Sequence, residues 1–150
     1  MTDLDDRWME RALALAREAA RHGEVPVGSL VVAPDGTAYE GHNRTRELSD
    51  PTAHAELLAI RHAAARLGDW RLEGHTLYAT LEPCAMCAGA IVLARVERVV
   101  FAALDPKAGM CSSLGNLLQD ERLNHRVELF SGVRADESST LLKEFFAERR

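Results

Sequence analysis

The chain has 150 residues, of which 47% are apolar and 27% are charged, and its formal net charge is −5. This length and balance suit one domain, residues 1–150, with one hydrophobic core. They exclude a long disordered region and a membrane span, since no run approaches about 18 apolar residues. The acidic balance also argues against a broadly basic nucleic-acid-binding surface, so a site for a polyanion would have to be a local patch.

The N-terminal stretch MTDLDDRWMERALALA is acidic and amphipathic, and it lacks the basic leader and the cleavage motif of a signal peptide. Three cysteines in a chain without such a leader indicate the reducing cytoplasm, where cysteines more often bind metal or act in catalysis than form disulfides. We therefore expect a cytoplasmic protein with no membrane partner.

Hydrophobic periodicity and the glycine and proline breaks predict the elements in chain order. The first half is typical of a helix over residues 5–23 and a hairpin with strands over 26–33 and 37–42. A polar loop over 43–52 and a second helix over 53–68 follow. The second half is typical of a strand over residues 74–81, a helix over 84–95 and a strand over 96–104. A loop with room for one short helix over 105–120, a strand over 125–132 and a last helix over 135–150 follow. The apolar stripe of the last helix is predicted at Leu141, Leu142, Phe145 and Phe146.

This order predicts an α/β fold in which helices cover one central sheet of five strands. The hairpin supplies antiparallel neighbours, and helical crossovers join the later strands, so we expect the sheet to be mixed.

Two short stretches carry side chains that suit a metal site. DPTAHAELLAI places His54 at the start of one predicted helix, and TLEPCAMCAG places Cys84 and Cys87 at the start of another. A helix N-terminus favours thiolates, and two cysteines three residues apart present both sulfurs on one side of the first turn. All three side chains are normal zinc donors, and three protein ligands leave a fourth position for water, as in catalytic zinc sites.

Glu56 stands two residues after His54. In a helix interior this spacing would put the two side chains on nearly opposite faces, but in the first turn both can fold over the helix end. A carboxylate in that position can exchange a proton with a zinc-activated water without binding the metal. The pattern indicates metal-assisted hydrolysis with Glu56 as the acid–base group.

Two other interpretations of the cysteine pair stay open at this point. A C-x-x-C pair can be a redox pair, although its insert here is Ala85–Met86 and a His-x-Glu lies upstream. A closed structural zinc site needs a fourth ligand, and Cys111 is the candidate, at no recognised spacing. We expect Cys111 to be a packed thiol near the site.

H-x-E followed by P-C-x-x-C is the signature of the zinc-dependent nucleobase deaminases, and here it is HAE and PCAMC. The surrounding stretches EVPVGSLVV, DPTAHAE, RLEGHTLYATLEPCAMCAGAIVLARVERVVF, DPKAG, NHRVE and LLKEFFAERR together resemble the bacterial tRNA-specific adenosine deaminases. The resemblance runs from Trp8 to Arg150.

This resemblance implies a cytidine-deaminase-like three-layer α/β/α sandwich that acts as a homodimer. It implies that one Zn²⁺ per chain is bound by His54, Cys84 and Cys87, and that Glu56 shuttles protons. The substrate would be the wobble adenosine in the anticodon loop of an arginine tRNA, which water attacks at C6 to give inosine and ammonia. The residues that the resemblance places near this substrate are Val27 and Asn43 at the target base, Asp105 and Lys107 at flanking nucleotides, and Asn124, His125 and Phe145 near the RNA.

Two other functions remain in view. A deaminase of a free base or nucleotide, such as guanine or cytosine, would share the same signature. A zinc-stabilised binding module without enzymatic activity would share the ligands but would have no need of an unligated carboxylate such as Glu56.

Overall fold

The computed structural model describes residues 2–149, and within them it contains the predicted helices and strands in the predicted order. The elements are α1 (Asp3–Arg21), β1 (Gly28–Val32), β2 (Ala38–His42), α2 (Ala55–Leu67), β3 (Thr76–Leu81), α3 (Ala85–Leu93), β4 (Arg98–Ala103), β5 (Glu128–Ser131) and α4 (Ala135–Ala147). The last predicted helix extends to Arg150, which lies outside the described residues.

The strands form one mixed sheet in the order β2-β1-β3-β4-β5. Strand β1 pairs antiparallel with both β2 and β3, while β3, β4 and β5 run parallel. The expected hairpin and the mixed five-stranded sheet are therefore confirmed. Because β3 and β4 are parallel, their carboxyl ends meet at one edge of the sheet, and the segments that follow them start side by side.

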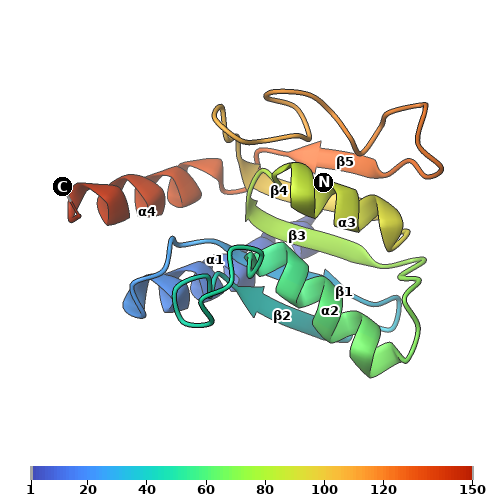
Figure 1. Cartoon of the computed structure of the whole chain (residues 1–150), viewed down its shortest axis with the longest axis horizontal. Coiled ribbons are helices and arrows are strands. Elements are labelled where there is room, and N and C mark those ends of the chain that lie inside the picture. The colour runs from blue at the N-terminus through green and yellow to red at the C-terminus, as the bar shows by residue number, and fades with distance from the viewer. Residues whose placement is uncertain (1, 150) are drawn as a thin grey trace.

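Helices cover both faces of this sheet, as the three-layer prediction requires (Figure 1). Helices α2 and α3 lie side by side on one face, and α1 lies on the other face with α4 packed against it. Alternate residues of each strand point to opposite faces, so β4 sends Val99 and Phe101 toward α2 and α3 and sends Val100 and Ala102 toward α1.

The N-terminal end of α1 is tied to the sheet through the buried carboxylate of Asp5. Its oxygens accept hydrogen bonds from the Tyr78 hydroxyl at 2.6 Å and from two nitrogens of the Arg98 guanidinium at 2.7 and 2.6 Å. Thr2 caps the same helix end, since the Asp5 amide donates to its hydroxyl and its own amide donates to the Asp5 carboxylate. The guanidinium fork fixes how α1 lies on β3 and β4.

The connection between the parallel strands β4 and β5 is a loop, as predicted for residues 105–120, and so it is not one of the helical crossovers expected between the later strands. Residues 104–127 form turns and isolated bridges, and the short helix for which the 105–120 segment left room does not form within it. The segment is ordered by its own anchors, because the side chains of Cys111 and Leu118 are fully buried in the core. Buried apolar side chains hold this segment in place, and hydrogen bonds in its turns satisfy its backbone N–H and C=O groups, so it needs no helix.

Across residues 2–149, no helix is both long and apolar enough to cross a membrane.

Candidate metal centre and catalytic pocket

His54 and Cys84 occupy the position immediately before the first turn of α2 and α3. At this N-cap position a side chain usually accepts a hydrogen bond from the helix backbone, but neither His54 nor Cys84 does so. Both side chains are left to face each other across the helix starts, and Cys87 joins them from the first turn of α3.

The three side chains lie at distances that suit a shared metal ion. His54 Nδ1 is 3.5 Å from Cys84 Sγ and 3.7 Å from Cys87 Sγ, and the three ligand atoms all lie within 4.8 Å of one another. A tetrahedral zinc ion with its usual bond lengths would separate a sulfur from an imidazole nitrogen by about 3.5–3.6 Å. The donor set and its spacing therefore fit zinc through three protein ligands.

The electrostatics of the two sulfurs also favour a cation between them. Hydrogen bonds from Cys87 and from the His54 ring lower the pKa of Cys84 to about 3. The neighbouring Cys84 sulfur and burial raise the pKa of Cys87 above the usual range of a thiol. A metal ion at this point can bind both sulfurs as thiolates, whereas a proton can stabilise only one of them.

A close packing contact places the first turn of α2 on the sheet. Gly41 of β2 faces this turn, and a Cβ at position 41 would overlap the backbone of Ala55 and Ala59. The helix start that carries His54 can therefore approach the sheet more closely than a larger residue would permit.

Asn43 takes over the capping role that His54 does not fill. Its side-chain oxygen accepts from the Ala55 amide at 2.9 Å, and its side-chain nitrogen donates to the Val25 carbonyl at 3.1 Å. The residue that the resemblance assigns to the target base thus also fixes the start of α2 beside the metal ligand His54.

Glu56 lies in the first turn of α2, as its predicted role requires. It is only 4% exposed, yet it lines a cavity of about 240 Å³ together with His54 and Cys84. Burial raises the pKa of its carboxyl to about 7. A carboxyl group with a pKa near neutrality can both take up and release a proton under physiological conditions.

The same cavity brings together three of the seven residues predicted near the substrate. Its lining includes Val27, Asn43 and Asp105. The cavity is also lined by Val25, Thr45, Leu81, Glu82 and Ala108. Residues far apart in the sequence therefore meet at the carboxyl end of β3 and β4, where ligands commonly bind in open α/β sheets.

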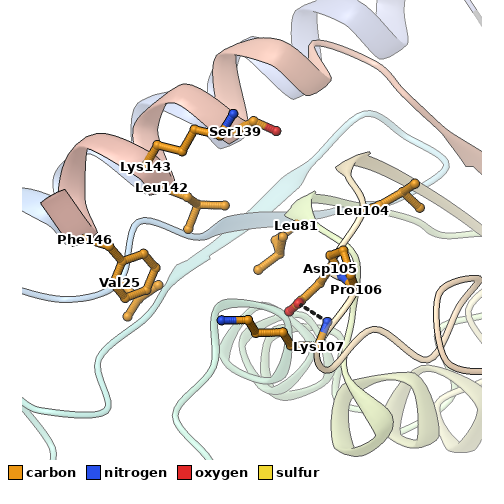
Figure 2. A pocket seen from close by; sticks show the side chains of 10 residues that line it. All are labelled: Val25, Leu81, Leu104, Asp105, Pro106, Lys107, Ser139, Leu142, Lys143 and Phe146. Carbon is orange, nitrogen blue, oxygen red and sulfur yellow. Dashed lines mark hydrogen bonds between the residues drawn. The ribbon is translucent and has the colours of Figure 1, made fainter.

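A second cavity of about 610 Å³ adjoins the first, since Val25, Leu81 and Asp105 line both. Figure 2 shows Lys143 and Phe146 reaching it from α4, and Lys107 reaching it from the loop after β4. The sequence contains two lysines, and both line this cavity. Neither lysine forms a salt bridge within residues 2–149.

Three predicted RNA contacts lie elsewhere in the single chain. His125 bonds the Val96 carbonyl at 2.7 Å, which places it and Asn124 at the amino end of β4, away from the metal ligands. Phe145 is 6% exposed and covered by the Arg149 guanidinium. The aromatic ring that reaches the second cavity is Phe146, which is 47% exposed.

Two buried carboxylates near these cavities had not been predicted from the sequence. Glu24 is 1% exposed and Glu82 is 2% exposed, and each accepts several hydrogen bonds from a loop that borders the catalytic cavity. The signal available in the sequence is Glu82 itself, a charged residue inside the otherwise uncharged run TLYATLEPCAMCAG.

Comparison with known proteins agrees with this geometry. Residues 2–103 match the family model of the cytidine and deoxycytidylate deaminase zinc-binding region. The tRNA-specific adenosine deaminase of Bacillus subtilis is 49% identical over 146 residues, which cover 97% of this chain and 91% of that protein.

Two solved structures extend the comparison to three dimensions. One, from a study of A-to-I editing by tRNA:A34 deaminases at the wobble position of transfer RNA, has a TM-score of 0.86 and 44% identity, covering 91% of this chain and 99% of that chain. The other, guanine deaminase from Bacillus subtilis, has a TM-score of 0.64 and 40% identity, covering 69% of this chain and 66% of that chain.

The fold, the metal site and the family model define the class of the protein as a zinc-dependent deaminase. Similarity to tRNA-specific enzymes extends over nearly the whole chain at high identity and is closer than the partial match to guanine deaminase. The chain belongs to the family of tRNA-specific adenosine deaminases.

Proposed function

We propose that this protein hydrolyses the amino group from the wobble adenosine of a tRNA anticodon loop, giving inosine and ammonia. The observation that carries the proposal is Glu56, a buried carboxyl group that shares the pocket with three metal ligands without belonging to the ligand set. The site of a structural zinc module has no use for such a group. Membership of the deaminase family supplies the reaction and the substrate class.

The residues of the chain divide the chemical work. His54, Cys84 and Cys87 would hold zinc, which when bound acts as a Lewis acid and lowers the pKa of water to about 7. Glu56 accepts a proton at its carboxylate and returns it to the base as the amino group leaves. The raised pKa of Glu56 matches this double use, and its burial keeps bulk water from the carboxylate.

Base recognition falls to Asn43 and Val27. The Asn43 amide has four hydrogen-bonding positions, and its contacts to Ala55 and Val25 occupy one acceptor and one donor. The remaining donor and acceptor are available to a purine edge. Val27, which is 5% exposed, provides an apolar wall.

The adjoining cavity suits the nucleotides that flank the target. An adenine in a helix cannot enter the catalytic cavity, so the base has to be splayed out, which costs least in a loop. Lys107 and Lys143 offer point charges to phosphates, while Leu142 and Phe146 offer an apolar surface to a base. Asp105 lines both cavities, and we assign it to the boundary between them.

The protein acts as a cytoplasmic homodimer in this proposal, with each chain forming one deaminase domain. Helix α3 supports the dimer because its sequence, AMCAGAIVL, contains no charged residue. Its outer face presents Met86, Gly89 and Leu93, and Leu93 is 71% exposed. A second copy of the chain is an occupant that would cover this apolar face.

A dimer also gives Asn124 and His125 a place in RNA binding. Both lie away from the pocket of their own chain, so we assign their contacts to RNA held in the pocket of the other subunit. Phe145 would act indirectly, by supporting Arg149 at the end of α4.

Deamination of a free base is the second candidate, because guanine deaminase from Bacillus subtilis shares 40% identity with this chain over 69% of its length. The two lysines beside the pocket favour RNA over a free base, which carries no phosphate.

Ammonia release separates the two functions. The protein is incubated with an anticodon stem-loop bearing a wobble adenosine, with free adenosine, with guanine and with cytosine. We expect ammonia and inosine from the stem-loop alone, and a loss of about 10²–10⁴-fold in Glu56→Gln, which keeps the size of the side chain. Turnover of guanine with no activity on the stem-loop would replace the proposed function by the second candidate.

A further inference from the structure

Glu24 and Glu82 are two buried carboxylates that the chemistry described above does not use. Within residues 2–149 neither forms a salt bridge with Lys, Arg or His. A buried carboxylate without a cation is costly unless hydrogen bonds compensate its charge. Their partners are backbone amides and two hydroxyls, and all these donors belong to two loops beside the catalytic cavity.

Glu82 directly follows β3 and precedes Pro83 and the ligand Cys84. One carboxylate oxygen accepts from the Asp105 amide at 3.0 Å and from the Ser113 hydroxyl. The other accepts from the Cys111, Ser112 and Ser113 amides at 3.1, 2.8 and 2.8 Å. Both ends of the 105–113 loop are therefore attached to one side chain.

The 105–113 loop is also shaped to admit this carboxylate. A Cβ at Gly109 would overlap the Glu82 carboxyl group, so the loop closes over it only with glycine at that position. Four backbone amides and one hydroxyl donate to the two Glu82 oxygens, an arrangement that suits a carboxylate, which offers acceptors only.

Glu24 makes the corresponding attachment on the other loop. It follows the end of α1, and its oxygens accept from the Arg46 amide at 3.1 Å, the Glu47 amide at 2.8 Å and the Thr45 hydroxyl at 3.3 Å. This loop begins at Asn43 and leads to His54. Thr45 lines the catalytic cavity, as Asp105 and Ala108 do from the other loop.

We infer that Glu24 and Glu82 are positioning residues that hold the two loops bordering the catalytic cavity at the separation a looped RNA substrate requires. This inference rests on the proposed function. Glu24 acts through Thr45 and Glu82 acts through Asp105, and Glu82 itself also lies in the wall of the catalytic cavity. We expect their effect on substrate binding, because the donors that they accept from belong to the two loops, whereas His54, Cys84, Cys87 and Glu56 lie at the starts of α2 and α3. The bridge between Cys84 and Gly109 is the point at which the 105–113 loop meets the metal site, and the zinc and cobalt measurements below report on it.

Glutamine is the sharpest substitution because it keeps the volume of the side chain. In Glu82→Gln the amide oxygen can still serve the three amides at Cys111, Ser112 and Ser113. Its NH₂ group would then meet the Asp105 amide, donor against donor, and the Asp105 end of the loop would be released. Gly109→Ala displaces the same loop while leaving Glu82 intact, and Glu97→Gln on the exposed surface serves as the matched control.

The test measures hydrogen exchange of loop amides, zinc content, the visible spectrum of the cobalt-substituted protein, and kcat and KM on the anticodon stem-loop. We expect Glu82→Gln and Gly109→Ala to raise KM about tenfold with kcat nearly unchanged, the loss that one unsatisfied buried donor brings. Exchange at Asp105 should accelerate, while the cobalt spectrum and zinc content stay those of the wild type. Glu24→Gln should likewise raise KM and accelerate hydrogen exchange at the Arg46 and Glu47 amides, with the cobalt spectrum and zinc content of the wild type.

Different results would overturn the inference. A changed cobalt spectrum, or a fall in kcat at constant KM, would place Glu82 in support of the metal centre. Unchanged loop exchange with a merely lower melting temperature would leave both residues with a general structural role. If the wild type itself fails on the stem-loop while loop exchange responds as expected, the proposed function is wrong and the attachment of the loops stands.

Discussion

At the scale of single residues, the metal site depends on two helix starts that give up their own caps. His54 and Cys84 sit where Ser, Asp or Asn normally accepts a backbone hydrogen bond, and their side chains point to the metal position instead. Asn43 compensates at α2 by accepting from Ala55 across twelve residues of sequence. Asn43→Ala should therefore disturb both base recognition and the placement of His54.

The cysteines provide a matched pair for testing the ligand set. Cys87 and Cys111 are both fully buried, but Cys111 Sγ lies 3.7 Å from the Pro83 carbonyl and outside the metal-binding group. Cys87→Ala should reduce zinc from about one ion per chain to near none and lower thermal stability, because metal binding is coupled to folding. Cys111→Ala should keep its zinc. Metal analysis that finds full zinc in Cys87→Ala would exclude it as a ligand.

Sequence reasoning placed the metal ligands and Glu56 because their spacing is local and their chemistry is specific. It could not identify Glu24 and Glu82, because their partners are backbone amides and hydroxyls 21 to 31 residues away, which no local pattern records. The resemblance places Phe145 near the RNA, which stays a prediction, and in the single chain the neighbouring Phe146 lines the second cavity. Adjacent helical positions point about 100° apart, so this choice depends on the exact rotation of α4.

At the scale of elements, helices and strands were predictable and one connection was not. The order of all elements is confirmed because each carries its own periodicity or breaks. The sequence predicts a loop with room for one short helix between β4 and β5; no helix forms there, and the segment is ordered by distant anchors such as Glu82 and the buried Leu118. Tertiary contacts, rather than local preference, decide the conformation of such a segment.

The attachment of α1 to the sheet gives a pH-dependent prediction. Hydrogen bonding to Arg98 holds the pKa of Asp5 below its usual value of 3.8. A depressed carboxyl pKa contributes stability that is present above the unfolded-state value and is lost as pH falls toward the folded-state value. Asp5→Asn should cost about 1.5–3 kcal/mol of unfolding free energy at pH 7, and its difference from wild type should narrow below pH 3.8.

Denaturant unfolding of the wild type and of Asp5→Asn, from pH 7 to pH 2.5, measures how their stability difference changes with pH. Asp6→Asn is the control, because Asp6 lies on the same helix and pairs with Arg134 at an exposed position, where an ion pair contributes little. A stability difference between wild type and Asp5→Asn that stays constant with pH would show that the Asp5 charge does not contribute.

We expect the two walls of the second cavity to make separable contributions to RNA binding. Lys107→Ala and Lys143→Ala remove charge from the loop after β4 and from α4, respectively. Each should lower the slope of log affinity against log salt by about 0.7 if it neutralises one phosphate of a single strand. Binding of the stem-loop over a salt series measures this, with Arg7→Ala on the exposed face of α1 as the control. A slope equal to that of the wild type would remove that lysine from the RNA path.

At the scale of the whole molecule, the positions of the charged side chains explain how an acidic protein can bind RNA. The chain carries −5 overall, but several of its arginines pair with carboxylates, and its two lysines stand together at one cavity. Long-range attraction of RNA is therefore weak, and selection falls to contacts made after a loop is bound. A fixed separation between the two loops that border the catalytic cavity suits this mode of RNA binding. The contacts with RNA are few, so each of them has to be positioned accurately.

Assembly is the last property that the whole molecule determines. Leu93 is 71% exposed at the end of the uncharged helix α3, and placing a charge there would oppose burial against a second copy. Leu93→Glu should convert a dimer into a monomer, while Leu4→Glu on α1, at a position 57% exposed, should remain a dimer. Sedimentation velocity at matched concentrations distinguishes the two variants.

Turnover of the stem-loop by the monomeric variant then tests the role assigned to Asn124 and His125. If these residues serve the pocket of the other subunit, Leu93→Glu should keep its zinc and lose stem-loop binding, because each pocket would lack the contacts supplied by its neighbour. A Leu93→Glu protein that is still dimeric would move the interface away from α3. A monomer with undiminished KM would show that one chain forms the RNA site by itself, and the contacts of Asn124 and His125 would have to be abandoned.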